Sequence, residues 1–174
     1  TIDTERFAEH FQQPSGQPAP IFNIEGRTYP VEIRYQAPPS ENDSEVSDWL
    51  VNQTVETLRT QSGDLLVFLP TEQDIRLTHK KLRGAINQMG SSAKVEILPL
   101  YARLSTEQQN SIFQPGKSRR VVLATNVAES SITVPRISCV IDTGTARISR
   151  YSPRNKVQRL PIEAISQASA NQRA

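Results

Sequence analysis

The sequence predicts an α/β fold, a doubly wound parallel sheet covered by helices on both faces. Short apolar runs bounded by turn residues recur between residues 45 and 144, and segments with helical periodicity separate them. Strands that alternate with helices at this spacing pair in parallel, and their continuous apolar character indicates burial on both faces. After residue 144 the pattern becomes that of a β-hairpin, so we expect a hairpin inserted beside the sheet.

The first 44 residues precede this alternation. Residues 4–11 favour a short helix, a proline-rich loop follows at 14–20, and residues 21–24 and 29–35 favour strands. The polar, proline-bearing run 36–44 is typical of a linker between domains. The domain that contains the sheet is therefore expected to begin only after this run.

The first strand of the predicted sheet follows a helix. We expect that helix to have Ser44 as its N-cap and to end near Arg59. Residues 65–69 are continuously apolar and predict a strand that is covered on both sides. The next helix carries an apolar stripe of Ile75, Leu82, Ile86 and Met89.

The remaining elements repeat this unit. Residues 95–101 predict a strand, and the Ser-x-x-Gln capping box at Ser105 predicts a helix that ends near Phe113. Further strands are expected at 120–124 and 137–141. Residues 145–151 and 156–160 then predict the two arms of the hairpin around a turn at 152–155, and residues 166–174 predict a last helix.

Charge is distributed unevenly along the chain. Residues 1–64 hold 4 basic and 11 acidic side chains, whereas residues 65–174 hold 16 basic and 7 acidic ones. This asymmetry favours a surface on the second half that faces a polyanion, with a merely solvated face as the alternative. A single cysteine, Cys139, lies in an apolar run and is interpreted as a packing residue in a cytoplasmic protein. No segment resembles a membrane span or a signal peptide, so no membrane partner is expected.

Two common kinds of catalytic site find little support. Gly116-Lys117-Ser118 resembles the end of a phosphate-binding loop, but the glycine required five positions earlier is Ser111. His10 and His79, the two histidines, are far apart in sequence, so we predict no metal site and no histidine triad.

Two segments favour binding of nucleic acid or phosphate. Residues 125–133 place hydroxyl and amide side chains directly after a buried strand, where parallel sheets bind ligands, although a polar turn with capping serines explains them equally well. No acidic residue lies between Thr143 and Ile162, and a basic hairpin with an aromatic residue suits a single-stranded nucleic acid. Its residues are Arg147, Arg150, Tyr151, Arg154, Lys156 and Arg159.

Four ordered motifs together resemble motifs IV, IVa, V and VI of the DEAH-box RNA helicases. They are Val67-Phe68-Leu69-Pro70-Thr71, Leu98-Pro99-Leu100-Tyr101, the run from Ala124 to Pro135, and the run from Gln167 to Ala174. The segment from Leu160 to Arg173 looks like the bacterial HrpA type. The resemblance covers essentially the whole chain.

The resemblance implies a RecA-like domain that works as one half of a motor. Residues 1–27 would be the end of a first RecA-like domain, 28–44 a linker, and 45–174 the second RecA-like domain, truncated within motif VI. The full-length protein would use ATP and Mg²⁺ to step 3′ to 5′ along single-stranded RNA, with DNA as an alternative partner. The first RecA-like domain of the same chain would be the second partner, and neither cofactor is expected to bind this chain tightly by itself.

The resemblance also implies roles for individual residues. Gln172 would position the attacking water, and the strand-separating hairpin would sit near the entering duplex. The implied RNA-binding residues are Pro70, Thr71, Arg103, Thr125, Asn126 and Ser130. The implied nucleotide-binding residues are Thr133, Arg147 and Arg173, and those of the hairpin are Arg150, Tyr151, Arg154 and Lys156.

Two positions depart from the pattern of the spliceosomal members of the family. Thr145 stands where they carry an aromatic residue that stacks on adenine, and Pro135 stands where they carry an aspartate. Loose base selectivity follows, with Arg147 as a substitute that stacks on the base. Two other functions remain as alternatives: a nonhydrolytic RNA-binding or adaptor module, and a regulator that binds nucleotide without nucleic acid.

Overall fold

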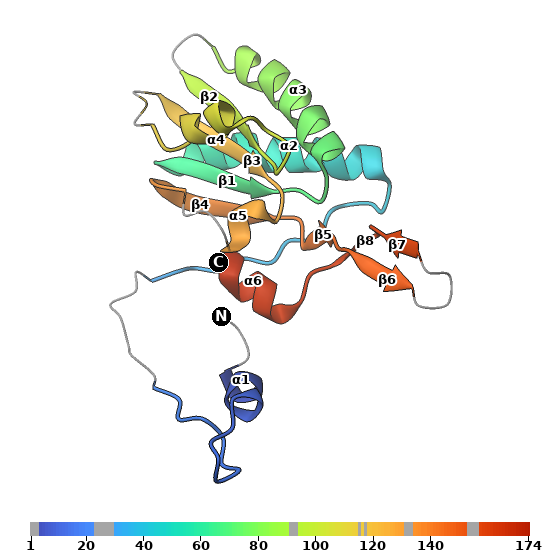
Figure 1. Cartoon of the computed structure of the whole chain (residues 1–174). Helices are drawn as coiled ribbons and strands as arrows, with labels where there is room; N and C mark the ends of the chain where they lie inside the picture. The colour runs from blue at the N-terminus through green and yellow to red at the C-terminus, as the bar shows by residue number, and fades with distance from the viewer. Residues whose placement is uncertain are drawn as a thin grey trace.

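The fold is built around one parallel sheet with helices on both faces (Figure 1). The computed structural model describes residues 4–22, 30–90, 94–114, 116, 118–130, 134–152 and 157–174. Its helices are α1 (Thr4–His10), α2 (Asp43–Thr60), α3 (Glu72–Gln88), α4 (Thr106–Ser111), α5 (Val127–Ser130) and α6 (Gln167–Arg173). Its strands are β1 (Asp64–Phe68), β2 (Val95–Leu100), β3 (Arg119–Ala124), β4 (Ile137–Asp142), β5 (Thr145–Arg147), β6 (Arg150–Ser152), β7 (Val157–Arg159) and β8 (Ile162–Ala164).

The sheet has the order β2-β3-β1-β4, and all its neighbouring strands run parallel. The predicted alternation of strand and helix is therefore confirmed. The chain crosses from β1 to β2 through α3, and it then inserts β3 between these two strands. Because all four strands point the same way, the loops that follow them leave from one edge of the sheet.

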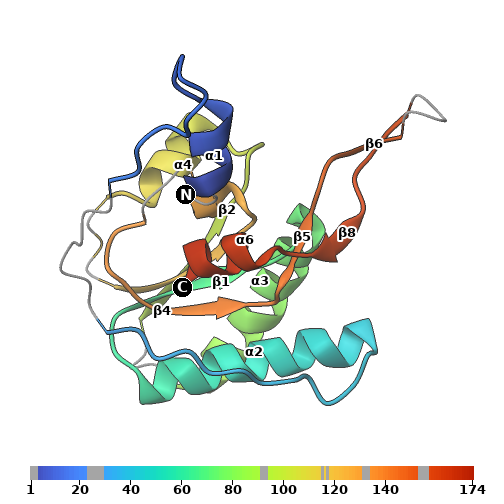
Figure 2. The same ribbon diagram turned by 90° about the horizontal axis from the view of Figure 1, so that it is seen from below.

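Alternate residues of the central strands enter two separate apolar cores. On one face, Leu65 and Val67 of β1 pack with the buried sides of α2 and α3. On the other face, Leu66 and Phe68 pack with Ile112, next to α4, and with residues of α5. Figure 2 shows the sheet lying between α2 and α4. This two-sided burial explains why the strands read as continuous apolar runs.

Of the two N-caps expected from the sequence, one is present and the other is a neighbouring residue. The capping box at Ser105 is present. The Ser105 hydroxyl oxygen accepts from the Gln108 N–H, and the Ser105 N–H donates to Gln108 Oε1. The prediction that Ser44 caps α2 is wrong. Asn42 is the N-cap, and its side chain accepts a hydrogen bond from the Ser44 N–H at 2.9 Å. An asparagine oxygen performs this task as well as a serine oxygen, so a neighbouring pair of such residues leaves the start ambiguous.

The predicted strand at 29–35 is not formed over residues 30–35, which belong to no strand. Its apolar side chains Val31, Ile33 and Tyr35 alternate and are 62%, 55% and 90% exposed. Tyr29 and the second half of the predicted strand 21–24 lie outside the described residues, and residues 21 and 22 are in no strand. The alternating pattern thus indicates only that these residues favour extended backbone. They would form a strand only if a neighbouring strand paired with them.

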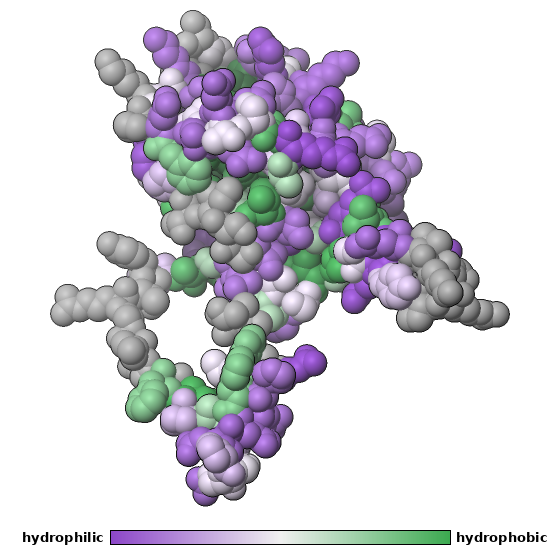
Figure 3. Space-filling model, in the orientation of Figure 1, coloured by the Kyte–Doolittle hydropathy of each residue, from purple (hydrophilic) through white to green (hydrophobic). Residues whose placement is uncertain are grey.

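The N-terminal segment exposes several apolar side chains. Phe7 and Phe11 stack on each other at 6.3 Å between ring centroids, and both are more than half exposed. Ile21 lines the same hollow as Phe7 and Phe11 and is 46% exposed, and Phe22 is 82% exposed. Apolar surface is visible on the lower part of the molecule (Figure 3). Exposed apolar residues in such a cluster are typical of a surface that another domain covers.

No helix in the described part of the chain is both long and apolar enough to cross a bilayer.

Candidate functional site

The loops that leave the carboxyl edge of the sheet are tied to one another by their backbones. The Leu69 N–H, just after β1, donates to the Ala124 carbonyl at 2.8 Å. The Thr125 N–H, just after β3, donates to the Leu100 carbonyl at the end of β2 at 3.1 Å. Three strand ends that are distant in sequence therefore hold their polar loops in fixed relative positions.

Thr71 combines a predicted binding role with a structural one. It is the N-cap of α3, and its hydroxyl accepts from the Asp74 N–H at 3.2 Å and donates to Asp74 Oδ2 at 2.5 Å. Pro70 and Thr71 are both half-buried. The 17-residue helix α3 begins immediately after Thr71, so its positive dipole end lies at the carboxyl edge of the sheet.

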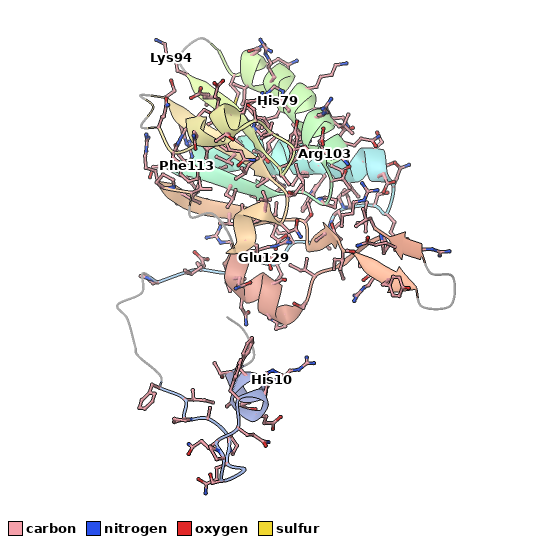
Figure 4. All side chains as sticks on the ribbon, in the orientation of Figure 1. His10, His79, Lys94, Arg103, Phe113 and Glu129 are labelled. Atoms are coloured by element: carbon pink, nitrogen blue, oxygen red, sulfur yellow. The ribbon has the colours of Figure 1, made fainter. Side chains whose placement is uncertain are left out.

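The other predicted RNA-binding residues occupy the neighbouring loops. Arg103 is exposed in the loop between β2 and α4 (Figure 4). Thr125 is half-buried and Asn126 is exposed, directly between β3 and α5. Ser130 is the last residue of α5, and its side chain is not among the described ones. The structure thus brings Thr71, Arg103 and the Thr125–Asn126 pair to the same edge of one sheet.

Helix α6 carries Gln172 and is anchored to this edge by Arg173. The Arg173 side chain is 2% exposed, and it donates from Nε to Glu129 Oε2 and from Nη1 to Asp142 Oδ1, both at 2.9 Å. Its guanidinium also lies over the Phe68 ring, 4.6 Å from the ring centroid. A single side chain therefore joins α6 to α5, to the end of β4 and to the end of β1.

A second bond connects the same two helices. The Ser169 hydroxyl of α6 donates to Glu129 Oε1 at 2.7 Å, so both carboxylate oxygens of Glu129 accept from α6. Figure 4 shows Glu129 on α5, next to α6. We call the group Phe68, Glu129, Asp142, Ser169 and Arg173 the Arg173 network.

Glu129 and Asp142 were not among the residues predicted for the site. Both carried a usable signal, since each is an acid at or just beyond the carboxyl end of a strand, in an otherwise uncharged run. Gln172 precedes Arg173 and is half-buried, so the predicted water-positioning side chain lies beside the anchored residue. Thr133, predicted to face the nucleotide, lies outside the described residues.

The hairpin has formed as two short ladders, β5 with β8 and β6 with β7, and it projects from the sheet in both ribbon views (Figures 1 and 2). Arg150 lies directly opposite Arg159, an arrangement that is unfavourable for two like charges. Arg150 also pairs with Glu163 Oε2, at 2.7 Å from Nη2 and 3.1 Å from Nε. Sequence reasoning missed this partner because Glu163 lies one residue beyond the acid-free run.

Other hairpin residues have different environments. Arg147 Nε donates to the Leu160 carbonyl at 3.0 Å, and this bond links the two arms between the ladders. Tyr151 is 66% exposed. Arg154 and Lys156 lie outside the described residues. The described part of the hairpin therefore presents an aromatic ring and several guanidinium groups on a projecting ribbon.

Cys139 lies half-buried on β4 and packs against the core next to α2 and α3. Burial raises the pKa of its thiol, while Arg119 and Arg34 oppose that change. A thiol with a raised pKa is a poor nucleophile at neutral pH, which agrees with its interpretation as a packing residue.

Comparison with known proteins assigns relatives to the chain. Residues 47–161 match the helicase conserved C-terminal domain. The ATP-dependent RNA helicase HrpA homolog of Haemophilus influenzae is 53% identical over 173 residues, which is 99% of this chain and 12% of that protein. The ATP-dependent RNA helicase HrpA of Escherichia coli is 54% identical over 176 residues, which is 99% of this chain and 13% of that protein. The chain thus spans about an eighth of the length of these curated relatives.

Solved structures show the same relationship. A crystal structure of the E. coli DExH-box NTPase HrpB matches with a TM-score of 0.75 and 39% identity, covering 89% of this chain and 19% of that one. A second crystal structure, of the E. coli DEAH/RHA helicase HrpB, matches with the same values. At this identity and TM-score, the parallel sheet and its flanking helices are those of the helicase C-terminal fold.

Proposed function

We propose that this chain, which belongs to the helicase conserved C-terminal domain family, acts as the second RecA-like domain of an ATP-dependent 3′-to-5′ RNA helicase. One observation carries the proposal. The loops after β1, β2 and β3 are hydrogen-bonded to one another at one edge of the sheet, and α6, with Gln172, is anchored to that same edge. Groups suited to RNA and groups suited to nucleotide are therefore joined at one edge of the sheet.

The RNA side of the proposal uses the carboxyl-edge loops. Pro70, Thr71, Arg103 and the Thr125–Asn126 pair, with Ser130, would hold the sugar-phosphate backbone. Hydroxyl groups, an amide and one guanidinium donate hydrogen bonds to phosphate oxygens without reading base edges. Contacts of this kind suit a motor that moves along RNA of any sequence, and DNA remains an alternative partner.

The nucleotide side of the proposal places ATP between this chain and a first RecA-like domain. Bound ATP, with Mg²⁺, supplies the phosphoryl group and the free energy that drives stepping. Gln172 fits the site because it is half-buried next to a residue fixed by two ion pairs, so it would orient the attacking water. Thr133 and Arg147 are proposed to contact the nucleotide's ribose and base, and the Mg²⁺ ligands are placed on the first domain.

The same proposal divides the chain and gives it a compartment. Residues 1–27 are assigned to the end of the first RecA-like domain, 28–44 to the linker and 45–174 to the second domain. The exposed apolar side chains of Phe7, Phe11 and Ile21 support the first assignment, since a neighbouring domain would cover them. We place the protein in the cytoplasm.

The hairpin is proposed to separate strands at the entering duplex. Its projection from the sheet, the exposed Tyr151 and the opposed Arg150 and Arg159 support this role. Arg154 and Lys156 are proposed to act with them. An aromatic ring stacks on an unpaired base while guanidinium groups neutralise phosphate.

The proposal is tested by fluorescence anisotropy of a single-stranded RNA oligomer titrated with this chain across a salt series, with the matching DNA oligomer alongside. Binding is expected with a log-log salt slope of about −0.7 for each phosphate neutralised. The double variant Arg150→Glu with Arg159→Glu, on the hairpin, should weaken it strongly. The matched control Lys80→Glu with Arg83→Glu makes the same charge change at exposed positions of α3 and should weaken it much less.

ATP hydrolysis provides the second half of the test. The chain alone is expected to hydrolyse no ATP, whereas a longer protein that also holds the first RecA-like domain should hydrolyse it faster when RNA is present. RNA binding by a longer protein that never hydrolyses ATP would instead support the adaptor alternative.

A further inference from the structure

We propose that Glu129 and Asp142 are positioning residues that act through Arg173 to make the RNA loops and α6 move as one body, and so couple RNA binding to the nucleotide site. The inference rests on the proposed function and deepens it. It starts from the three elements that the Arg173 side chain joins: α5 through Glu129, β4 through Asp142 and β1 through Phe68.

The charges around Arg173 decide what its guanidinium is able to do. One positive group lies between two carboxylates, each at 2.9 Å, so the local sum of these three groups is negative. A phosphate brought to this guanidinium would meet both carboxylates at close range, and like charges repel strongly in a partly buried site. Arg173 is therefore better suited to hold α6 in place than to bind the nucleotide directly, which revises its predicted role.

Helix α6 depends on this network for its position. Among the described residues of α6, Arg173 is the one that is buried. An apolar stripe, which docks α2 and α3, is absent from its sequence Gln167–Arg173. The side-chain bonds from Ser169 and Arg173 to Glu129, and from Arg173 to Asp142, are what fix the helix to the sheet edge.

The network is close in sequence to the predicted RNA contacts. Glu129 lies three residues after Asn126 on the same short helical turn, and its N–H donates to the Asn126 carbonyl at 3.1 Å. Phe68 ends β1, two residues before Pro70. A displacement of α6 on nucleotide binding therefore pulls on both RNA loops, and a displacement of those loops by RNA moves Gln172. Coupling between two sites is reciprocal, so each ligand changes the affinity of the other by the same factor.

The test uses a longer protein containing this chain and the first RecA-like domain. The dissociation constant of a single-stranded RNA oligomer is measured with and without a nonhydrolysable ATP analogue and Mg²⁺, and the ratio of the two values is the coupling factor. A coupled wild type is expected to show a factor of about 5 to 150. Glu129→Gln with Asp142→Asn, and separately Arg173→Lys, should bring the factor close to one.

Steady-state kinetics give a second readout. Because a displaced Gln172 would misplace the attacking water, the variants should lower kcat for ATP and leave KM close to that of wild type. The control variant Asp48→Asn makes the same chemical change in an ion pair of 2.7 Å with Lys81, between α2 and α3, and should alter neither the coupling factor nor kcat. Thermal melting of every variant reports on folding.

The outcomes separate the inference from the proposed function. A wild type that neither binds RNA nor hydrolyses ATP would overturn the proposed function itself. A coupled wild type whose variants keep the same coupling factor would overturn the inference alone. Variants that lose stability, RNA affinity and kcat together would assign the network to folding and would also overturn the inference.

Discussion

Arg120 and Arg173 are the two buried arginines in the described part of the chain, and they are held in opposite ways. Arg120 is gripped by Asp64, at 2.7 Å from Nη2, and by the backbone carbonyls of Ile112 and Pro135, at 2.6 and 2.9 Å. The bonds of Arg173 described above reach side chains on α5 and β4 instead. The contacts of Arg120 thus include backbone carbonyls, which the fold fixes, whereas the hydrogen bonds of Arg173 are to side chains of other elements.

The two arginines also mark opposite edges of the sheet. Arg120 is at the amino end of β3 and Asp64 begins β1, so this pair joins neighbouring strands where they enter the sheet. The Arg173 network lies where the strands leave it. In parallel α/β folds ligands bind at the carboxyl edge. The comparison therefore suggests that similar ion pairs stabilise the fold at one edge and, in our proposal, position the binding loops at the other.

Among the variants that test this contrast, Arg120→Met is expected to cause the largest loss of stability. Asp64 is fully buried, and removal of its partner leaves an uncompensated charge, so the free energy of unfolding should fall by about 3 to 5 kcal/mol. Urea denaturation of the chain measures it. The double variant Arg120→Met with Asp64→Leu removes both charges and should recover most of the loss. Arg136 Nε lies 3.5 Å from Asp64 Oδ2 and should offset part of the stability lost in Arg120→Met. If Arg120→Met were as stable as wild type, Arg136 would be sufficient to compensate the Asp64 charge, and Arg120 would not be needed.

Arg173→Met should cost less in the same measurement, about 1 to 3 kcal/mol. The side chains of Glu129 and Asp142 are 14% and 23% exposed, so they are able to regain water when their partner is lost. A loss as large as that of Arg120→Met would mean that the carboxyl edge is as important for folding as the amino edge, and the contrast would disappear.

At the carboxyl edge, Thr71→Ala tests the cap of α3. Loss of its hydroxyl removes the acceptor for the Asp74 N–H, and a lost N-cap typically costs about 1 kcal/mol. Urea denaturation is again the measurement. Thr71→Ser keeps the oxygen and should stay close to wild type, and equal losses in the two variants would exclude the capping bond as the cause.

The smallest effect is expected from Glu163→Gln, which removes the partner of Arg150 on the hairpin. The Glu163 and Arg150 side chains are 36% and 62% exposed, so solvent screens the pair and its loss should lower the free energy of unfolding very little. The difference from wild type should shrink further in concentrated salt. A large, salt-independent loss would show that the base of the hairpin belongs to the folded core.

Local sequence patterns predicted most elements of the sheet because each depends on residues that are neighbours in the chain. The apolar run at Leu65–Leu69 and the capping box at Ser105 are examples, and both appear in the structure within a residue of the expected place. The predictions that failed were for elements that form only when a distant part of the chain pairs with them. Residues 30–35 have the alternation of a strand but no neighbouring strand, and Pro30 also removes a hydrogen-bond donor.

The candidate site divides in the same manner. The resemblance placed polar loops after β1, β2 and β3, and the structure brings those loops to one edge. The resemblance gave no indication that Glu163 pairs with Arg150, because that pair depends on the register of the two hairpin arms.

By itself, the sequence determined that this chain forms a parallel sheet with helices on both faces and polar loops at the ends of its strands. The hydrophobic periodicity that specifies these features is local. Only the tertiary structure decided the strand order β2-β3-β1-β4 and the partners of Arg173, which lie 44 and 31 residues away in the chain. Contacts over such separations depend on which strands become neighbours, and no local pattern of residues encodes that choice.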